Sequence, residues 1–483
     1  MNQAILKLEP MALWKNFSNL NAVPRASKKE EQVIQFMMDY GKSLGLETIK
    51  DHIGNVIIKK PATAGMEDRI TVVMQSHLDM VHQKNAAVDF DFATEGIKMV
   101  YDNDWISAEG TTLGADNGIG VATIMALLEA TEIPHPAIEA LFTIDEETGM
   151  TGALELKGGM LTGGIMLNLD TEDDNELTIG CAGGVDITST GNYTQADNKH
   201  TKSFKLSVTG LSGGHSGMDI HKGLGNANKI MNRILFALAA RCDISVSEID
   251  GGGLRNAIPR ESFAIISHND IELLEEAVKE ISPAIISEHN TTDPDLAISL
   301  EQVELRKTCL DGTFQANLLR SIYACQNGIF RMSPDVEGLV QTSNNLARVL
   351  VKDGKYQILC LTRSSVESEK DELVKTITSS FLMLGAEVST SGTYPGWTPK
   401  PSSDIVKLMS ELYENRFNEE PHVNACHAGL ECGILGQNYP EMDMISFGPN
   451  IRGAHSPDEK VQVSSVQKFW GYLLEVLENF PKK

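Results

Sequence analysis

Three short apolar segments of this chain each stop at residues whose side chains can bind a cation. Uninterrupted apolar runs of this length indicate strands that are buried on both faces, as in parallel sheets covered by helices. In an open sheet of that kind the carboxyl ends of the strands form one edge, where ligands bind. The sequence therefore predicts that imidazole and carboxylate groups gather along one sheet edge. The segments are 70–74, 138–144 and 165–169, and the residues that follow them are His77-Leu78-Asp79, Asp145-Glu146-Glu147 and Asp170.

Helical patterns separate the apolar segments. Ser27-Lys28-Lys29-Glu30 has the composition of a capping box, and apolar residues at helical spacing follow it as far as Leu44, before Gly45. Strands that alternate with helices indicate an α/β fold, with a mostly parallel mixed sheet flanked by helices. The other helices predicted for this part of the chain are 119–130, 403–416 and 465–480, and the other strands are 55–59 and 444–449.

The pattern changes near residue 184. From there to residue 394 the elements repeat as two β-α-β-β-α units, which predict an inserted α+β domain built on an antiparallel sheet. The Pro-rich segment 394–401 is the expected return linker, so the first domain comprises 1–183 plus 395–483 and the inserted domain 184–394. The strands predicted in the insertion are 204–208, 244–249, 262–266, 301–306, 336–343, 347–352 and 356–363, and the helices are 225–240, 270–281, 313–325 and 368–384.

Size and composition are those of a soluble two-domain protein. The chain has 483 residues, of which 41% are hydrophobic and 22% charged. Because no apolar run approaches the roughly 20 residues that cross a bilayer, we expect no membrane contact. Residues 1–6 lack the basic and apolar regions of a signal peptide, so we expect a cytoplasmic location.

Charge and cysteine content exclude two other classes. The formal net charge of −25 argues against a nucleic-acid partner, which requires a basic surface. The seven cysteines are scattered and form no Cys-x-x-Cys pair, so neither a zinc knuckle nor a redox pair is indicated. We expect reduced, mostly buried thiols.

His77, Asp79 and Asp116 are the first candidate site residues. A ligating histidine usually donates its second ring N–H to a carboxylate, and Asp79 is placed for that role; the alternative is a hydrogen-bonded surface pair. Asp116 stands between Gly114 and Gly118, which allow close backbone approach. Its two oxygens can bridge two cations, although a helix N-cap would use the same residue.

The adjacent carboxylates Glu146 and Glu147 repel each other unless a cation lies beside them. One of the pair can bind a metal while the other holds a water molecule. Asp170 ends another predicted strand, and His455 lies in the glycine-bounded loop 453–457. Imidazole and carboxylate ligands suit Zn²⁺, and also Mn²⁺ or Co²⁺. No His-Glu-x-x-His occurs, which excludes the single-zinc arrangement of thermolysin.

As a set, these motifs resemble the di-metal peptidase family that includes aminoacylase and the carnosinases, and within it the bacterial aminoacyl-histidine (Xaa-His) dipeptidases. The resemblance spans residues 13–457 and includes three further motifs. They are Leu-Trp-x-x-Phe at 13–17, Gly213-Gly214-His215-Ser216-Gly217 and His427-Ala428-Gly429-Leu430-Glu431, beside Gln75-Ser76-His77-Leu78-Asp79-Met80-Val81.

The resemblance implies a di-zinc exopeptidase-like catalytic domain and a role for each site residue. Asp116 would bridge two metal ions, most simply Zn²⁺, with His77 and Asp170 on one ion and Glu147 and His455 on the other. Glu146 would be the general base that acts on a metal-activated water, and Asp79 would orient His77. The implied substrates are Xaa-His dipeptides such as β-alanyl-histidine.

In the inserted domain the resemblance implies a lid that also forms a homodimer. His215 would stabilise the transition state, in cis or across the dimer, and Asn256, Arg363 and Gly429 would contact the substrate. From the sequence alone His215 could equally be incidental to a glycine-rich turn, and Arg363 could form a surface ion pair. Glu431 could simply be an acid in the first turn of a helix.

Three alternative functions stay open at this point. A broader di- or tripeptidase and an N-acyl-amino-acid amidohydrolase would use the same site. A non-catalytic peptide-binding descendant is the third, against which the intact Glu146 argues. A serine hydrolase is excluded because the sequence around Ser216 lacks the Gly-x-Ser-x-Gly spacing.

Overall fold

The computed structural model describes residues 4–483. The absence of a signal peptide was predicted from residues 1–6, of which residues 1–3 lie outside the described residues. The chain forms two compact units. Unit 1 contains the chain up to Gly180, Pro399–Ala425 and Leu430–Lys483; unit 2 contains Cys181–Thr398 and Cys426–Gly429. Within the described residues, no helix has the length and apolar character needed to cross a membrane.

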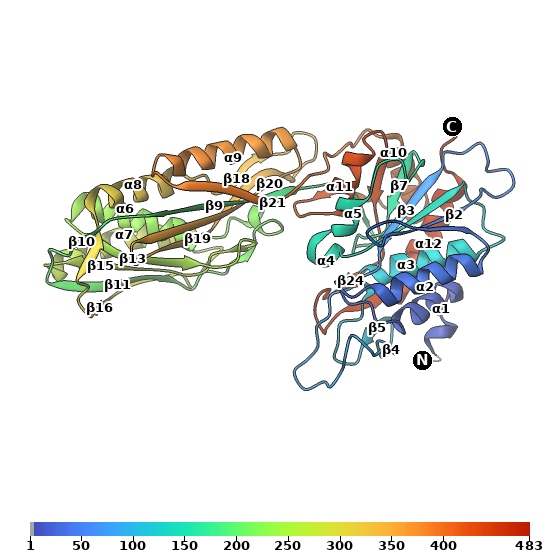
Figure 1. Cartoon of the computed structure of the whole chain (residues 1–483), viewed down its shortest axis with the longest axis horizontal. Helices are drawn as coiled ribbons and strands as arrows, with labels where there is room; N and C mark the ends of the chain where they lie inside the picture. Colours follow the sequence, from blue (N-terminus) through green and yellow to red (C-terminus); the bar gives the residue numbers. More distant parts are fainter. Residues whose placement is uncertain (1–3) are drawn as a thin grey trace. The chain divides into compact units, whose positions relative to one another are not determined.

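Unit 1 is built on an eight-stranded sheet with the order β1-β2-β6-β3-β7-β23-β8-β22. Its strands β2, β3 and β7 are labelled in Figure 1. Its four central strands run parallel: β6 (Ile138–Thr143), β3 (Val72–His77), β7 (Ile165–Asn168) and β23 (Asp443–Ser446). The outer strands β1 (Glu47–Lys50), β2 (Val56–Lys60) and β8 (Glu176–Cys181) run antiparallel to their neighbours, and β22 (His422–Cys426) completes the edge. The predicted mixed α/β fold is confirmed.

Helices cover this sheet because their apolar faces match its fully buried central strands. α3 (Ala115–Glu129) packs on β3, and α1 (Met11–Asn21) packs on α3. The small residues of α3 are nearly all buried, which permits this close packing. The remaining long helices of the unit are α2 (Glu31–Ser43), α10 (Asp404–Phe417) and α12 (Val463–Glu478).

The predicted capping box at Ser27 is wrong. α2 begins at Glu31, and the Glu30 at its N-cap makes no side-chain capping bond. Ser27 thus lies three residues before the N-cap, and its hydroxyl donates to Asp79 Oδ2 at 2.8 Å, a strong bond because the acceptor is a carboxylate. Ser27 therefore belongs to the environment of Asp79, not to the helix terminus.

A four-stranded sheet, β24-β25-β5-β4, holds the loop that carries His455. β24 (Ile451–Arg452) and β25 (Lys460–Gln462) pair antiparallel, so the residues between them form a hairpin loop. β5 (Trp105–Ala108) and β4 (Met99–Asp102) complete the sheet. β4 and β5 were not predicted, because the segment 82–112 that contains them is polar.

Unit 2 contains a nine-stranded sheet with the order β16-β11-β15-β13-β19-β20-β9-β21, beside which β18 also pairs with β19 (Figure 1). Its pairs are antiparallel, as predicted for the insertion. The strands are β9 (Gly183–Asn192), β11 (Lys202–Thr209), β13 (Ser245–Gly252), β15 (Ser262–His268), β16 (Ala297–Val303), β18 (Gly328–Met332), β19 (Val340–Lys352), β20 (Lys355–Ser364) and β21 (Glu387–Tyr394).

The helices of unit 2 are α6 (Ala227–Arg241), α7 (Ile271–His289), α8 (Gly312–Ala324) and α9 (Glu367–Leu382). Two strands predicted at 336–343 and 347–352 are one continuous strand, β19, because its polar Asn344 and Asn345 are buried and hydrogen-bonded. β9 and β21 were not predicted; most residues of β21 are exposed, so it carries no apolar signal. α7 also continues through Pro283, beyond the predicted end at 281.

The centre of the parallel sheet should dominate the stability of unit 1. Phe142 on β6 is fully buried, so Phe142→Ala should lower the free energy of unfolding of this unit by about 3–5 kcal/mol. Leu154 on α5 (Thr151–Glu155) is 47% exposed, and Leu154→Ala should change it by less than about 0.5 kcal/mol. Urea unfolding of the two variants measures the difference; equal midpoints would contradict this packing.

Candidate metal centre

The seven site residues predicted in unit 1 lie around one edge of its sheet. β3 and β6 end in register, with His77 opposite Thr143, and β7 lies on the other side of β3 with Asn168 opposite Gln75. The residues that follow these strands therefore meet: Asp79 after β3, Glu146 and Glu147 in α4 (Glu146–Gly149) after β6, and Asp170 after β7. Asp116 in the first turn of α3 and His455 in the β24–β25 loop complete the set.

Asp116 is the residue that the other ligating groups share. Its Oδ1 lies 3.1 Å from His77 Nε2, and its Oδ2 lies 3.1 Å from His455 Nε2. Asp170 Oδ1 is 3.6 Å from the same nitrogen of His77, and Glu147 Oε2 is 3.0 Å from that of His455. Two groups that each could hold a metal ion result, His77-Asp116-Asp170 and Asp116-Glu147-His455, with ligand atoms within 4.8 Å of one another.

Asp79 holds the second nitrogen of His77. The backbone carbonyl oxygen of Asp79 lies 3.2 Å from His77 Nδ1 and its Oδ1 lies 3.3 Å from the same nitrogen, which leaves Nε2 directed at Asp116. The same carboxylate accepts the backbone N–H of Glu146 at 3.0 Å and of Glu147 at 3.3 Å, besides the Ser27 hydroxyl. Burial acts to raise the pKa of Asp79, but these donors and His77 outweigh it and lower the pKa. An ionised Asp79 thus fixes both the imidazole and the start of α4.

Arg25 links the segment after β3 to the turn before α3 by hydrogen bonds, and no sequence pattern predicted this role. It is 2% exposed and donates through Nη1 to the carbonyl oxygens of Leu78 at 3.1 Å and Asp79 at 3.2 Å. Through Nη2 it donates to the Gly114 carbonyl at 2.5 Å. Because its partners are mainly backbone carbonyls, no residue pattern could have revealed it. Burial lowers its pKa to about 10, so it stays cationic at neutral pH.

The cluster carries more negative charge than the protein alone neutralises. Burial, aided by the charges of Asp170 and Glu431, raises the pKa of Glu146 well above its usual value despite the opposing effect of His77. Burial likewise raises the pKa of Asp170 to about 6. Hydrogen bonds to Asp116 and Glu147 raise the pKa of His455 to about 11. Carboxylates that resist ionisation and imidazoles that resist deprotonation both indicate a missing positive charge.

The residues present fit divalent metal ions. Glu147 Oε1 is buried and has no hydrogen-bond partner among the described residues, so it is available as a ligand. Each group offers one imidazole nitrogen and two carboxylates, the donors that Zn²⁺, Mn²⁺ and Co²⁺ accept.

The buried carboxyl of Glu431 lies beneath this edge. Glu431 is the first residue of α11 (Glu431–Asn438), and its Oε2 accepts from Gln75 Nε2 and from Thr143 Oγ1, both at 2.6 Å. Burial raises its pKa to about 7. Glu431 therefore links β3 to β6 through buried hydrogen bonds. It is not simply an exposed acid in the first turn of a helix.

The four remaining predicted residues belong to unit 2, where the side chains of Arg363 and His215 both lie close to Gly217. A Cβ placed on Gly217 would lie 3.1 Å from Arg363 Nε and 3.2 Å from His215 Cε1. It would also lie 2.2 Å from the carbonyl oxygen of His427, so only glycine fits here. Gly429 is the last residue of the segment Cys426–Gly429, which belongs to unit 2. The neighbouring Ala428 carbonyl accepts a hydrogen bond from Ala182 N at 3.0 Å.

His215 is held as a neutral hydrogen-bond donor. Its Nδ1 accepts the backbone N–H of Gly217 at 3.2 Å and of Met218 at 3.0 Å, which places the ring proton on Nε2. Burial and the nearby Arg363 lower the pKa of His215, although Asp219 acts in the opposite direction. The pKa of His427 is also lowered, to about 3, mainly by burial and then by the charge of Arg363. The Nε2 atom of His427 forms a hydrogen bond with Ser343 Oγ at 2.8 Å.

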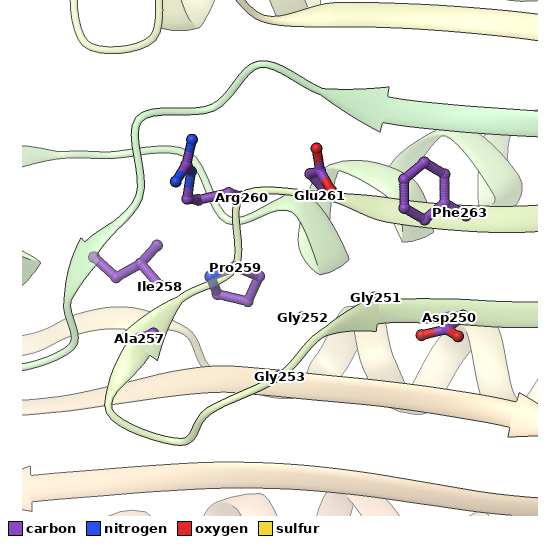
Figure 2. Close-up of a pocket in the computed structure, with 10 residues that line it drawn as sticks. All are labelled: Asp250, Gly251, Gly252, Gly253, Ala257, Ile258, Pro259, Arg260, Glu261 and Phe263. Carbon is purple, nitrogen blue, oxygen red and sulfur yellow. The ribbon is translucent and has the colours of Figure 1, made fainter. Parts of the chain in front are cut away.

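Asn256 is exposed and lies in the turn before β14 (Ala257–Ile258). β14 pairs with β12 (Gly214–His215), and the Asn256 carbonyl accepts from Ser216 N at 2.8 Å, so Asn256 and His215 adjoin one small two-stranded sheet. A cavity of about 460 Å³ lies beside this sheet and is lined in part by Ala257 and Ile258 (Figure 2). Its lining residues are Asp250, Gly251, Gly252, Gly253, Ala257, Ile258, Pro259, Arg260, Glu261 and Phe263.

Arg363 is 5% exposed and therefore does not form the surface ion pair that its sequence context allowed. Its Nη1 donates to the Tyr394 hydroxyl at 2.7 Å, while its Nε is buried without a partner among the described residues. The guanidinium thus retains a free donor in a buried, polar setting.

The fold and the paired imidazole–carboxylate groups define a metallopeptidase. A family comparison makes the assignment specific: the model of peptidase family M20/M25/M40 matches residues 73–479. The chain belongs to this family.

Two relatives match over nearly the whole chain. The chain is 41% identical over 480 residues to the cytosol non-specific dipeptidase of Escherichia coli K12, covering 99% of each sequence. The crystal structure of aminoacylhistidine dipeptidase from Vibrio alginolyticus matches with a TM-score of 0.95 at 41% identity, covering 99% of this chain and 98% of that one. Aminopeptidase PepT from Bacillus cereus shares the fold, with a TM-score of 0.57 at 16% identity over 98% of both chains.

Divalent ions should stabilise the metal-free protein. Zinc at 100 times its dissociation constant should raise the free energy of unfolding by about 2.7 kcal/mol per site, because it binds only the folded chain. Thermal unfolding with and without zinc measures this gain. Asp116→Ala should abolish most of it, since both candidate groups use that carboxylate. A gain that survives in Asp116→Ala would contradict a shared ligand.

Proposed function

We propose that this chain is a metal-dependent dipeptidase that hydrolyses Xaa-His dipeptides such as β-alanyl-histidine. The observation that carries the proposal is the position of Asp116, whose two oxygens each face a different histidine at 3.1 Å. The two relatives at 41% identity support it, since both are named as dipeptidases and one as an aminoacylhistidine dipeptidase.

In this proposal His77 and Asp170 would hold one ion, Glu147 and His455 would hold the other, and Asp116 would be a ligand of both. Zn²⁺ suits these ligands best, with Co²⁺ or Mn²⁺ as alternatives. When bound, the pair of ions supplies Lewis acidity that lowers the pKa of water and polarises a peptide carbonyl.

Glu146 is the proposed general base. Its backbone is fixed by Asp79 at 3.0 Å, and its raised pKa suits a group that takes a proton from water and returns it to the leaving amine. Asp79 itself keeps the His77 ring in one orientation. Both roles depend on Asp79 remaining ionised, which its lowered pKa favours.

The residues of unit 2 act on the substrate. His215 donates a hydrogen bond from Nε2–H to the oxyanion that develops during attack, because its Nδ1 already accepts two backbone N–H groups. Arg363 pairs with the substrate carboxylate, and Asn256 and Gly429 contact its backbone. Unit 2 serves as a lid and as the contact of a homodimer in the cytoplasm, with His215 acting in cis or in trans.

A broader dipeptidase is the second candidate. It is favoured by the E. coli relative, which is named a non-specific dipeptidase at the same 41% identity. An N-acyl-amino-acid amidohydrolase and a peptide-binding protein without activity are the remaining alternatives, and the experiments below separate them.

Glu146→Gln should lower kcat by about 100- to 10,000-fold, the range expected for loss of a general base. Its metal content should stay at the wild-type level, because Glu146 is not among the candidate ligands. The matched variant Glu147→Gln should instead lose metal. Elemental analysis and initial rates measure both effects. Unchanged turnover in Glu146→Gln would overturn the assignment of the base.

Substrate choice separates the candidate functions. Zinc-loaded protein should cleave β-alanyl-histidine faster than dipeptides without histidine, and both faster than N-acetylated amino acids. Rates that are equal across dipeptides would favour the broader dipeptidase. Faster cleavage of the acetylated compounds would favour the amidohydrolase, and no cleavage of any substrate would favour a binding protein.

A further inference from the structure

The loop that carries Asp116 is held by a single buried carboxylate from elsewhere in the chain. Glu459 Oε2 accepts the backbone N–H of Leu113 at 2.7 Å and of Gly114 at 2.9 Å. Its Oε1 accepts the N–H of Ala115 at 2.7 Å and of Asp116 at 3.2 Å. Four consecutive amides thus converge on one side chain, which is 2% exposed.

Glu459 lies in the same hairpin loop as His455. The loop is itself tightened, since the N–H of Glu459 donates to the Ser456 carbonyl at 3.1 Å. Glu459 and Asp116 are 343 positions apart in the sequence. One carboxylate therefore joins the loop of His455 to the loop of Asp116, the two segments whose side chains meet at 3.1 Å.

We infer that Glu459 is a positioning residue that fixes Asp116 between His77 and His455, an inference that rests on the proposed two-metal function. Both oxygens of Asp116 are directed at histidines, so that side chain is not available to satisfy the amides of its own loop. An anion at the amino terminus of α3 also complements the helix dipole. A carboxylate accepts two N–H groups on each oxygen, whereas a side-chain amide would present hydrogen atoms to two of the four donors.

Glu139 offers a matched control in the same unit. It is 4% exposed, and its carboxylate accepts the N–H of Thr162 at 2.7 Å, the N–H of Gly163 at 3.0 Å and the Thr162 hydroxyl at 2.9 Å. It lies on β6 and contacts none of the candidate ligands in these bonds. Glu139→Gln therefore removes a buried charge and comparable backbone bonds without touching the Asp116 loop.

The test is zinc affinity of the full-length chain, measured by competition with a chromogenic chelator. Glu459→Gln should bind both ions about 10- to 100-fold more weakly, because the misplaced Asp116 serves both. Glu459→Asp, which keeps the charge, should show a smaller loss, and Glu139→Gln should match the wild type. Thermal unfolding of each metal-free protein reports fold stability separately from affinity.

Zinc affinity in Glu459→Gln equal to that in Glu139→Gln would overturn the inference. If the amide variant does not fold, Glu459→Asp carries the comparison under the same criterion. A wild-type protein that fails to bind two ions would refute the proposed function instead, so the two failures are distinguishable.

Discussion

The structure of unit 1 depends on one carboxylate that faces two imidazoles. Asp116 lies between His77 and His455, with Asp170 and Glu147 on the outer sides of those histidines. Such an arrangement places several acids in a buried space where like charges are strongly unfavourable. Both the pKa of Asp170, at about 6, and the pKa of His455, at about 11, are raised, as expected where negative charge is in excess. Divalent cations would neutralise this excess of negative charge, which is the physical basis for proposing that the cluster binds them.

The remainder of the site consists of groups that hold the ligands in place. Asp79 fixes His77 and the first amides of α4, and Arg25 ties the carbonyls after β3 to the Gly114 turn. Glu459 binds the amides on the other side of that turn. Each of these side chains is polar and almost fully buried, and each is stabilised by several hydrogen bonds that offset the cost of its burial. Because the candidate ligands are held in place, Asp116 can belong to both candidate metal groups.

The sequence predicted the centre of the fold well, because buried parallel strands carry an uninterrupted apolar signal. The seven predicted site residues, which the structure brings together, were proposed for a related reason: they follow strands such as β3 and β7, or lie in turns rich in glycine. Strands with mixed polarity were missed, such as β21 at an exposed edge, and β19 was divided in two. The supporting residues Arg25, Ser27 and Glu459 were also missed. Their partners are distant in the sequence and are mostly backbone groups, which no local pattern records.

Anomalous diffraction from crystals grown with excess zinc or manganese tests the central claim most directly. The account predicts two peaks that share the Asp116 carboxylate. One should lie about 2.0–2.2 Å from His77 Nε2 and the other at the same distance from His455 Nε2, the range typical of zinc ligands. A single peak, or two peaks neither of which contacts Asp116, would contradict it.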